Sequence, residues 1–301
     1  MVVVNKLNKE NFLNPKNDIV FKIFFAAAKN KVLLISFLES ILDPAKTIED
    51  VEILNPTLPK DAYKDKGIVL DIVVKFKDQT RVDVEMQVEY TTGFRKRILY
   101  YWSKLHQSQL QFGELYPKLA PTISIAVLAY NEFENSPDEV HSIFELRERS
   151  RGELYLPDMQ LHFLELQKYG LWKKKYQQKH PLLDHWIQFF KINDLSEAEM
   201  LKLLEEPIMG KALKALEEMS NDPANKELAE MREKARVNLL IITSEAKAEG
   251  IAEGEAKGKA EGEAKGKAEG ILKMAKKGFD AKEIASIFDM TIEEIQNILK
   301  A

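Results

Sequence analysis

The chain has 301 residues, a formal net charge of −4 and no cysteine. This length suits one or two domains, and 45% hydrophobic residues are enough to build a packed core. The lack of cysteine excludes disulfides and thiolate-ligated zinc sites. The apolar run at residues 1–4 is too short for a signal-peptide core, and the longer apolar runs have only the length of strands. We therefore expect a soluble cytoplasmic protein with no membrane partner.

The first predicted element is a helix over residues 17–42, where apolar side chains recur at helical spacing until Asp43-Pro44 ends it. Three strand-like runs follow, and residues 77–80 predict a hairpin turn between the second and third. The third run alternates between apolar and polar side chains. The three runs cover residues 51–54, 68–76 and 81–90.

A helix over residues 95–114 is predicted next, followed by a continuously apolar strand over 122–130 that suits burial on both faces. Two more strands are predicted at 140–146 and 161–166. A strand–helix–strand crossover favours a mixed sheet covered by helices. The order therefore predicts an α/β fold, with a mixed sheet flanked by helices and followed by a helical C-terminal region from residue 181.

Residues 246–270 follow a four-residue repeat in which every fourth residue is glycine. Charges of opposite sign lie four residues apart and would support a helix by about 1.5–3.5 kcal/mol in total. Six glycines would cost a helix about 5–6 kcal/mol relative to alanine. The repeat therefore predicts a marginal helix or a flexible connector.

The tail, residues 271–301, predicts a small helical unit with two capping boxes, Asp280 with Glu283 and Thr291 with Glu294. A helix-turn-helix is one interpretation. However, its DNA-reading helix would begin with Glu293-Glu294, which repel phosphates. Docking or self-association is the favoured role, so homo-oligomerisation through the helical C-terminal region is one expectation. The predicted divisions are a core at 1–170, a helical extension at 171–245, a linker at 246–270 and a tail at 271–301.

Acidic and amide side chains on two neighbouring predicted strands are the candidate chemistry. Asp71 interrupts an apolar strand, where a lone carboxylate is costly to bury unless it is paired or bound to a metal. Strand alternation puts Asp83, Glu85 and Gln87 on one face of the next strand. If these strands pair as a hairpin, Asp71 and Glu85 converge, and two carboxylates with a backbone carbonyl suit Mg²⁺ or Mn²⁺.

This pattern resembles the PD-(D/E)XK nucleases, and in particular the Rpn-like recombination-promoting nucleases, which are also called PD-(D/E)XK family transposases. The resemblance covers roughly residues 14–240 and, more loosely, the tail. It rests on short motifs in order and spacing: residues 17–24, Leu70-Asp71-Ile72, Val84-Glu85-Met86-Gln87, residues 97–102, residues 141–144 and Leu164-Glu165-Leu166.

The resemblance implies a restriction-endonuclease-like fold and a Mg²⁺-dependent endonuclease that acts on double-stranded DNA in recombination or transposition-like processing. It implies that Asp71 and Glu85 are metal ligands. It places Gln87 where the family has a lysine or glutamine that positions water or phosphate, and makes Asp18 an acidic residue that supports the metal. The sequence departs from the family motif in two places, because Leu70 replaces the motif's proline and Gln87 is uncharged.

Plainer interpretations stay open beside this one. In these interpretations the strand carboxylates form only a polar hairpin face, and Asp18 is a helix N-cap. Asp83 and Glu89 are then solvated neighbours of the site. The five histidines show no paired ligand spacing, which favours structural roles. Two cationic runs, whose alternative is a solvated surface, are candidate DNA contacts: Arg95, Lys96 and Arg97, and Lys173, Lys174 and Lys175.

Two other functional classes also stay open. One is a catalytically weak or inactive member of the same fold that binds DNA or assists assembly, which the neutral Gln87 and the low-complexity repeat favour. The other is a plain scaffold protein. The overall acidity argues mildly against a simple DNA binder, but a nuclease needs only a local basic patch beside its acidic ligands.

Overall fold

The computed structural model describes residues 12–43, 47–54 and 71–300. The chain divides into two compact units, residues 1–233 and 234–301. Helices α4 to α7, within the predicted extension at 171–245 or close to it, belong to the first unit together with the sheet. The finer division into core, extension, linker and tail stays a prediction.

In the described residues, one mixed sheet of six strands has the order β1-β2-β3-β4-β6-β5. The central strands β3, β4 and β6 run parallel, whereas β1, β2 and β5 pair antiparallel at the two sides. The predicted α/β fold with a mixed, helix-flanked sheet is confirmed. The strands are β1 (Val51–Leu54), β2 (Ile72–Phe76), β3 (Arg81–Gln87), β4 (Thr122–Leu128), β5 (His141–Glu145) and β6 (Met159–Glu165).

The helices follow the prediction in outline but differ in detail. The first predicted helix is two helices, interrupted by a 3-10 turn at Ala28–Asn30. The helix over Tyr169–Tyr176 begins two residues before the predicted helical extension at 171–245. The helices of the first unit are α1 (Asp18–Ala26), α2 (Lys31–Leu42), α3 (Phe94–Gln107), α4 (Tyr169–Tyr176), α5 (Pro181–Phe190), α6 (Glu197–Glu205) and α7 (Pro207–Asn221).

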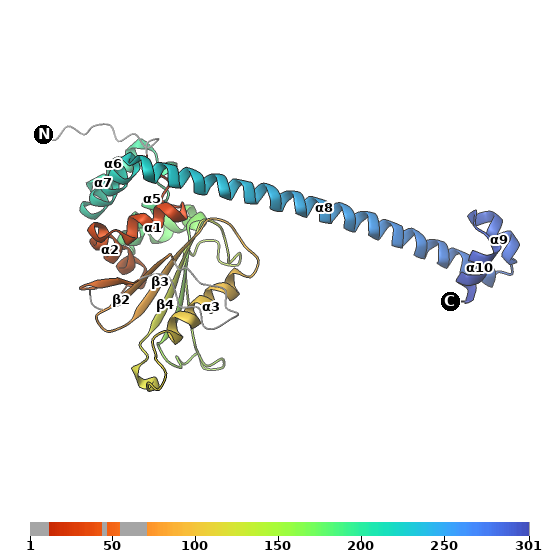
Figure 1. Ribbon diagram of the computed structural model, residues 1–301, viewed down its shortest axis with the longest axis horizontal. Coiled ribbons are helices and arrows are strands. Elements are labelled where there is room, and N and C mark those ends of the chain that lie inside the picture. Colours follow the sequence, from red (N-terminus) through yellow and green to blue (C-terminus); the bar gives the residue numbers. More distant parts are fainter. Residues whose placement is uncertain (1–11, 44–46, 55–70, 301) are drawn as a thin grey trace. The chain divides into compact units, whose positions relative to one another are not determined.

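The two faces of the sheet have different covers (Figure 1). On one face, apolar side chains of β2, β3 and β4 share a large core with α1, α2, α5 and α7. Aromatic rings dominate it, with Trp186 centred 5.6 Å from Phe25 and 5.5 Å from Phe37. On the other face, α3 packs through Phe94 and Ile98 against β4 and β6. Strand β4 is buried along its whole length, as its continuous apolar sequence predicts.

A buried ion pair fixes the loop that follows β4. The side chains of Glu165 and Lys168 are 0% and 2% exposed, and Lys168 Nζ donates to Glu165 Oε2 at 2.6 Å. Lys168 also donates to the Phe133 carbonyl at 2.6 Å. The other Glu165 oxygen accepts the backbone N–H groups of Glu132 and Phe133 at 2.6 and 3.0 Å. The ion pair therefore binds the Glu132 and Phe133 N–H groups and the Phe133 carbonyl, and so fastens this loop to the end of β6.

Two histidines meet at the β5 edge of the sheet. His141 Nε2 lies 3.0 Å from His162 Nδ1, and His162 Nε2 lies 3.3 Å from Gln160 Oε1. Their spacing in the sequence gives no hint of this pairing, which depends on the alignment of β5 with β6. Burial lowers the pKa of His162 to about 3 and of His141 to about 4, and in each case a neighbouring histidine adds to the effect. Both side chains are therefore neutral at physiological pH.

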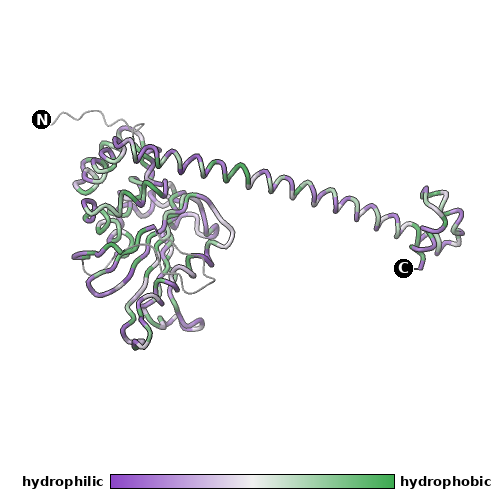
Figure 2. Tube along the Cα trace, in the orientation of Figure 1, coloured by the Kyte–Doolittle hydropathy of each residue, from purple (hydrophilic) through white to green (hydrophobic). Residues whose placement is uncertain are grey.

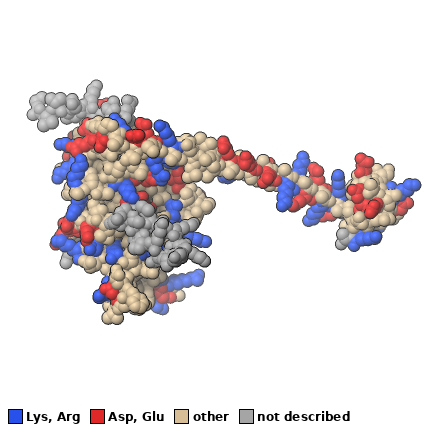
Figure 3. Space-filling view, in the orientation of Figure 1, with Lys and Arg blue, Asp and Glu red and all other residues tan. Residues whose placement is uncertain are grey.

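Helix α8 (Pro223–Lys276) continues through the whole glycine repeat, so the helical alternative for residues 246–270 is the one observed. Helix propagation from ordered flanking turns is less costly than nucleation within the repeat. Figure 2 shows one hydrophobic stretch in an otherwise hydrophilic helix, and residues 239–242 are exposed there. Acidic and basic side chains alternate along the repeat (Figure 3).

The second unit closes with α9 (Ala281–Phe288) and α10 (Ile292–Lys300), which share a small core with the end of α8. Both predicted capping boxes are present: Asp280 and Glu283 begin α9, and Thr291 and Glu294 exchange hydrogen bonds before α10. None of the helices in the described ranges is long and apolar enough to cross a membrane.

The Glu165–Lys168 pair predicts a large loss of stability when one partner is removed. Lys168→Met should lower the free energy of unfolding by about 3–5 kcal/mol, because the Glu165 carboxylate is left buried without its cation. Urea denaturation measures this. The matched control is Lys118→Met, which removes an exposed lysine paired with Glu114 and should leave the urea midpoint unchanged. Equal urea midpoints for the two variants would contradict a stabilising role of the Glu165–Lys168 ion pair.

The histidine pair predicts a pH dependence. In the unfolded chain each histidine titrates near pH 6.5. Below that pH the histidines of the unfolded chain bind protons, whereas the buried pair of the native state stays neutral. The stability present at neutral pH is therefore lost as the pH falls towards about 4. His162→Gln should reduce the loss between pH 7 and 4.5 by about 2–3 kcal/mol relative to wild type. Parallel stability profiles for the two proteins, followed by chemical denaturation, would argue against the buried neutral pair.

Candidate active site

The hairpin formed by β2 and β3 positions the predicted site residues. Ile72 lies opposite Val84 and Val73 opposite Asp83, so the next pair along the register is Asp71 with Glu85. This is the register that the sequence prediction assumed, and it is confirmed. The predicted strand residues 68–70 lie outside the described residues. Residues 77–80 form the tight turn, in which the Phe76 N–H donates to the Thr80 carbonyl at 2.9 Å.

Alternation along β3 separates an apolar face from a polar one. Val82, Val84 and Met86 belong to the large core. Asp83 lies across from Val73, which packs against Leu105 of α3. Residues opposite each other in an antiparallel pair share a face. Asp83, Glu85 and Gln87 therefore occupy the face of the sheet that α3 covers.

Asp71 and Glu85 are joined by reciprocal contacts where the β2–β3 ladder ends. The Asp71 N–H donates to Glu85 Oε1 at 3.1 Å, and the Met86 N–H donates to Asp71 Oδ2 at 3.0 Å. Each carboxylate thus satisfies a backbone donor that the ladder no longer pairs. These contacts bring the Asp71 and Glu85 side chains close together at the end of the hairpin.

Burial makes this cluster reluctant to carry negative charge. It raises the pKa of Asp71 to about 6, with the charge of Asp18 acting in the same direction and the hydrogen bond from Met86 opposing it. Burial also raises the pKa of Glu85 well above its usual range, and the charges of Asp71 and Asp83 add to this. Glu85 is only 5% exposed to solvent. A compensating cation would relieve the repulsion.

Asp83 is not the solvated neighbour that the sequence suggests. It is fully buried, and its Oδ1 accepts a hydrogen bond from the Ser124 hydroxyl on β4. Burial raises its pKa to about 7, which the Ser124 hydrogen bond only partly opposes. Among the described residues its other oxygen, Oδ2, has no hydrogen-bond partner. The expectation failed because strand alternation gives the face of a residue but not whether a helix covers that face.

Gln87 lies between the acidic cluster and the first turn of α3. Its Nε2 donates to Glu85 Oε2 at 3.3 Å, and its Oε1 accepts from Arg97 Nη2 at 2.5 Å. Arg97 was predicted as a DNA contact, and its link to Gln87 was not foreseen. The signal available was helical spacing, which puts Arg97, Tyr101 and Leu105 on one face of α3.

Asp18 occupies the first turn of α1 but is not its N-cap. The N-cap is Asn17, whose side chain accepts the N–H groups of Ile19 and Val20. The Asp18 carboxylate instead binds Arg232, with contacts of 2.8 and 2.7 Å from Nε to its two oxygens. Its charge reaches Asp71 and raises the pKa of that carboxyl. Asp18 therefore acts on the cluster electrostatically while an arginine holds it.

The chemistry of these donors fits a hard divalent cation. Two carboxylates at the end of a hairpin offer oxygen ligands, and Mg²⁺ commonly takes one or two carboxylates together with substrate oxygens and water. The unpaired buried oxygen of Asp83 and the raised pKa values of Asp83 and Glu85 indicate that ionised carboxylates here lack compensating partners among the described residues. No set of three or more metal-binding side chains converges within the part of the chain that the structure describes.

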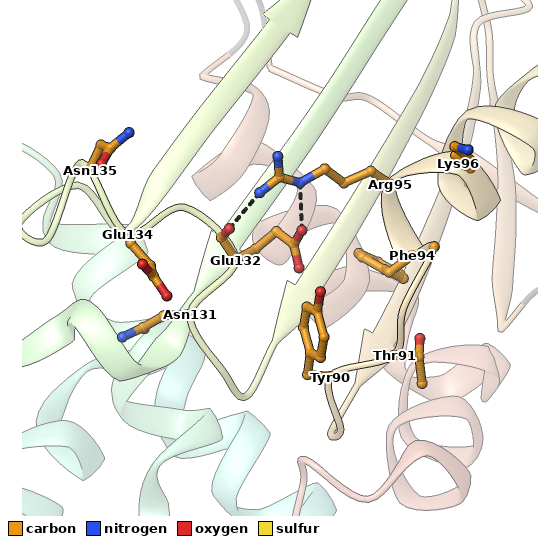
Figure 4. A pocket seen from close by; sticks show the side chains of 10 residues that line it. Tyr90, Thr91, Phe94, Arg95, Lys96, Asn131, Glu132, Glu134 and Asn135 are labelled. Carbon is orange, nitrogen blue, oxygen red and sulfur yellow. Dashed lines mark hydrogen bonds and ion pairs between the residues drawn. The ribbon is translucent and has the colours of Figure 1, made fainter. Parts of the chain in front are cut away.

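A pocket of about 780 Å³ lies between the start of α3 and the loop after β4 (Figure 4). Tyr90, Phe94 and Asn131 contribute to its walls. Arg95 is held at the pocket by Glu132, with Nε donating to Oε1 at 2.6 Å and Nη2 to the Glu132 carbonyl at 2.7 Å. The Glu165–Lys168 pair fixes that same loop, so the arginine has a defined position.

The cations predicted to contact DNA fall in two places. Arg95, Lys96 and Arg97 occupy the first turn of α3, close to the site. Lys173 and Lys175 lie on α4 and pair with Glu199 at 3.6 Å and with Asp138, respectively, while Lys174 is exposed. The first group is linked to the acidic cluster through the hydrogen bond from Arg97 to Gln87.

Comparison with known proteins adds a family to this geometry. No curated protein and no solved structure matches the chain. The family model described as PD-(D/E)XK nuclease family transposase matches residues 15–245, which include the whole sheet, α3 and the candidate site. The match spans more than half of the 301 residues and agrees with the resemblance seen in the sequence motifs. The chain therefore belongs to the PD-(D/E)XK nuclease family of transposases.

Proposed function

We propose that this protein is a Mg²⁺-dependent DNA endonuclease that hydrolyses phosphodiester bonds in recombination or transposition-like processing. Its family supports a nuclease-like or transposase-associated role. The observation that carries the proposal is the cross-strand pair of Asp71 and Glu85, with the Gln87 amide in contact with Glu85. Mn²⁺ would replace Mg²⁺ at such an oxygen site.

In this proposal Asp71 and Glu85 hold the cation, and the charge of Asp18 supports them from α1. When bound, a divalent cation polarises a phosphate oxygen and makes water more acidic. Gln87 has one amide that can both donate and accept, so it would orient the attacking water or the scissile phosphate. Burial of the carboxylates keeps competing solvent away from the reacting groups.

Double-stranded DNA is the proposed substrate and partner. Arg95 and Lys96 at the start of α3 would contact its phosphates near the site, because both side chains are exposed there. Lys173, Lys174 and Lys175 on α4 would extend this contact. Self-association through the helical C-terminal region belongs to the same proposal, and the exposed apolar residues 239–242 of α8 support it.

Plasmid nicking in the presence of Mg²⁺ tests the activity. Asp71→Asn and Glu85→Gln should each reduce the cleavage rate at least about 100-fold, because each removes an anionic ligand. The changes replace a half-buried and a buried carboxyl by neutral groups of similar shape, so the thermal melting temperature should not fall. Glu52→Gln, which alters an exposed carboxylate on β1, is the matched control and should cleave like wild type.

The outcome also separates the proposal from its alternative. Equal cleavage by wild type and both site variants would remove Asp71 and Glu85 from the mechanism. Salt-dependent DNA binding by wild type without any metal-dependent cleavage would instead favour an inactive DNA-binding or assembly module of the same fold.

A further inference from the structure

The Gln87 amide has an orientation that its neighbours dictate. Arg97 has only N–H groups and can only donate, so the amide oxygen must face it. The Glu85 oxygen on the other side accepts from the amide nitrogen at 3.3 Å. The reverse orientation would put the amide nitrogen against Arg97, where two donors cannot form a hydrogen bond. Arg97, Gln87 and Glu85 therefore form one directed chain of hydrogen bonds.

Arg97 is itself held firmly on α3. Its guanidinium carbon lies 5.2 Å from the centroid of the Phe94 ring, and Phe94 is only 3% exposed. The backbone N–H of Arg97 closes the first helical turn by donating to the Gly93 carbonyl at 3.0 Å. Backbone and ring together restrict the directions in which the side chain can point. Its contact with Gln87 is thus built into the packing of α3 on the sheet.

The charge of Arg97 faces an acidic cluster that Gln87 cannot neutralise. Asp83 and Glu85 are both buried, and Asp71 lies against Glu85. Within the described residues, the buried Nε of Arg97 has no hydrogen-bond partner. A buried donor on a charged group normally finds a partner, because leaving it unpaired is costly. Local costs of this kind are characteristic of functional sites.

We propose that Arg97 is a positioning residue of the site, which fixes the Gln87 amide and supplies, from α3, the positive charge that this glutamine lacks. The inference rests on the proposed nuclease function and deepens it. Gln87 and Arg97 then act as a unit: the strand contributes the polar group nearest the carboxylates, and the helix contributes the cation. In this arrangement the positive charge lies on the helix and not at the strand position.

A charge swap tests this unit by steady-state cleavage kinetics. Arg97→Gln should lower kcat about 10–100-fold with little change in KM, because the amide loses its anchor and the charge is gone. Arg97→Lys should recover at least a third of the wild-type kcat. Gln87→Lys alone should lower kcat. It places the lysine cation against the Arg97 cation, and it removes the amide oxygen that accepts from Arg97. The double variant Gln87→Lys with Arg97→Gln should exceed both single variants by about fivefold or more.

A role limited to folding or DNA contact predicts other results. Lys96→Gln, an exposed cation in the same helical turn, is the control and should raise KM while leaving kcat unchanged. If Arg97→Gln behaves like Lys96→Gln, or if the double variant is no better than the worse single variant, the inference is overturned.

A readout without catalysis separates this inference from the proposed function. In glutamine-labelled protein, the side-chain amide signal of Gln87 should shift in Arg97→Gln and stay near its wild-type position in Lys96→Gln. An unchanged Gln87 signal in Arg97→Gln overturns the positioning role. A shifted signal in a protein whose wild type does not cleave DNA would support the positioning while the nuclease function fails.

Discussion

The pairing of β2 with β3 is the constraint on which the site depends. Ile72 lies opposite Val84, and this register alone brings Asp71 to Glu85 at the open end of the hairpin. A slip of one residue would turn Asp83, Glu85 and Gln87 towards the aromatic core and expose their apolar neighbours. The burial of Val82, Val84 and Met86 against α1 and α2 therefore fixes the positions of the polar groups on the opposite face.

This register carries an electrostatic cost. Asp83 and Glu85 are buried on a strand of the sheet, and burial opposes the ionisation of both. Such an arrangement persists only because the surrounding packing is strong, with Trp186, Phe25 and Phe37 on the far face of the same sheet. The stability of the scaffold offsets the electrostatic cost of the cluster. A bound cation would remove this cost, and that relief would add to the affinity for the cation.

Much of this arrangement follows from the sequence. Alternation in β3, the turn at residues 77–80 and the largely apolar β4 are enough to predict the hairpin, the buried central strand and the two faces. The approach of Asp71 to Glu85 follows from the same pattern once the register is assumed. These features are local, or depend on strands that are neighbours in sequence, and so periodicity reveals them.

The rest depends on contacts between distant segments. The burial of Asp83 requires Ser124 and the cover of α3, and the Asp18–Arg232 pair joins the first helix to α8. The pairing of His141 with His162 depends on the alignment of the edge strand β5 with its neighbour β6. Arg97 looked like one cation in a surface run, because the sequence does not show that it reaches Gln87. Spacing along one element cannot predict such partners.

The central claim is that the Asp71–Glu85 pair holds a divalent cation, and anomalous scattering from crystals soaked in Mn²⁺ tests it most directly. The account predicts an anomalous peak within coordination distance of one oxygen from each carboxylate, which Asp71→Asn removes. A peak elsewhere in the molecule, or none at this site at millimolar Mn²⁺, would contradict it.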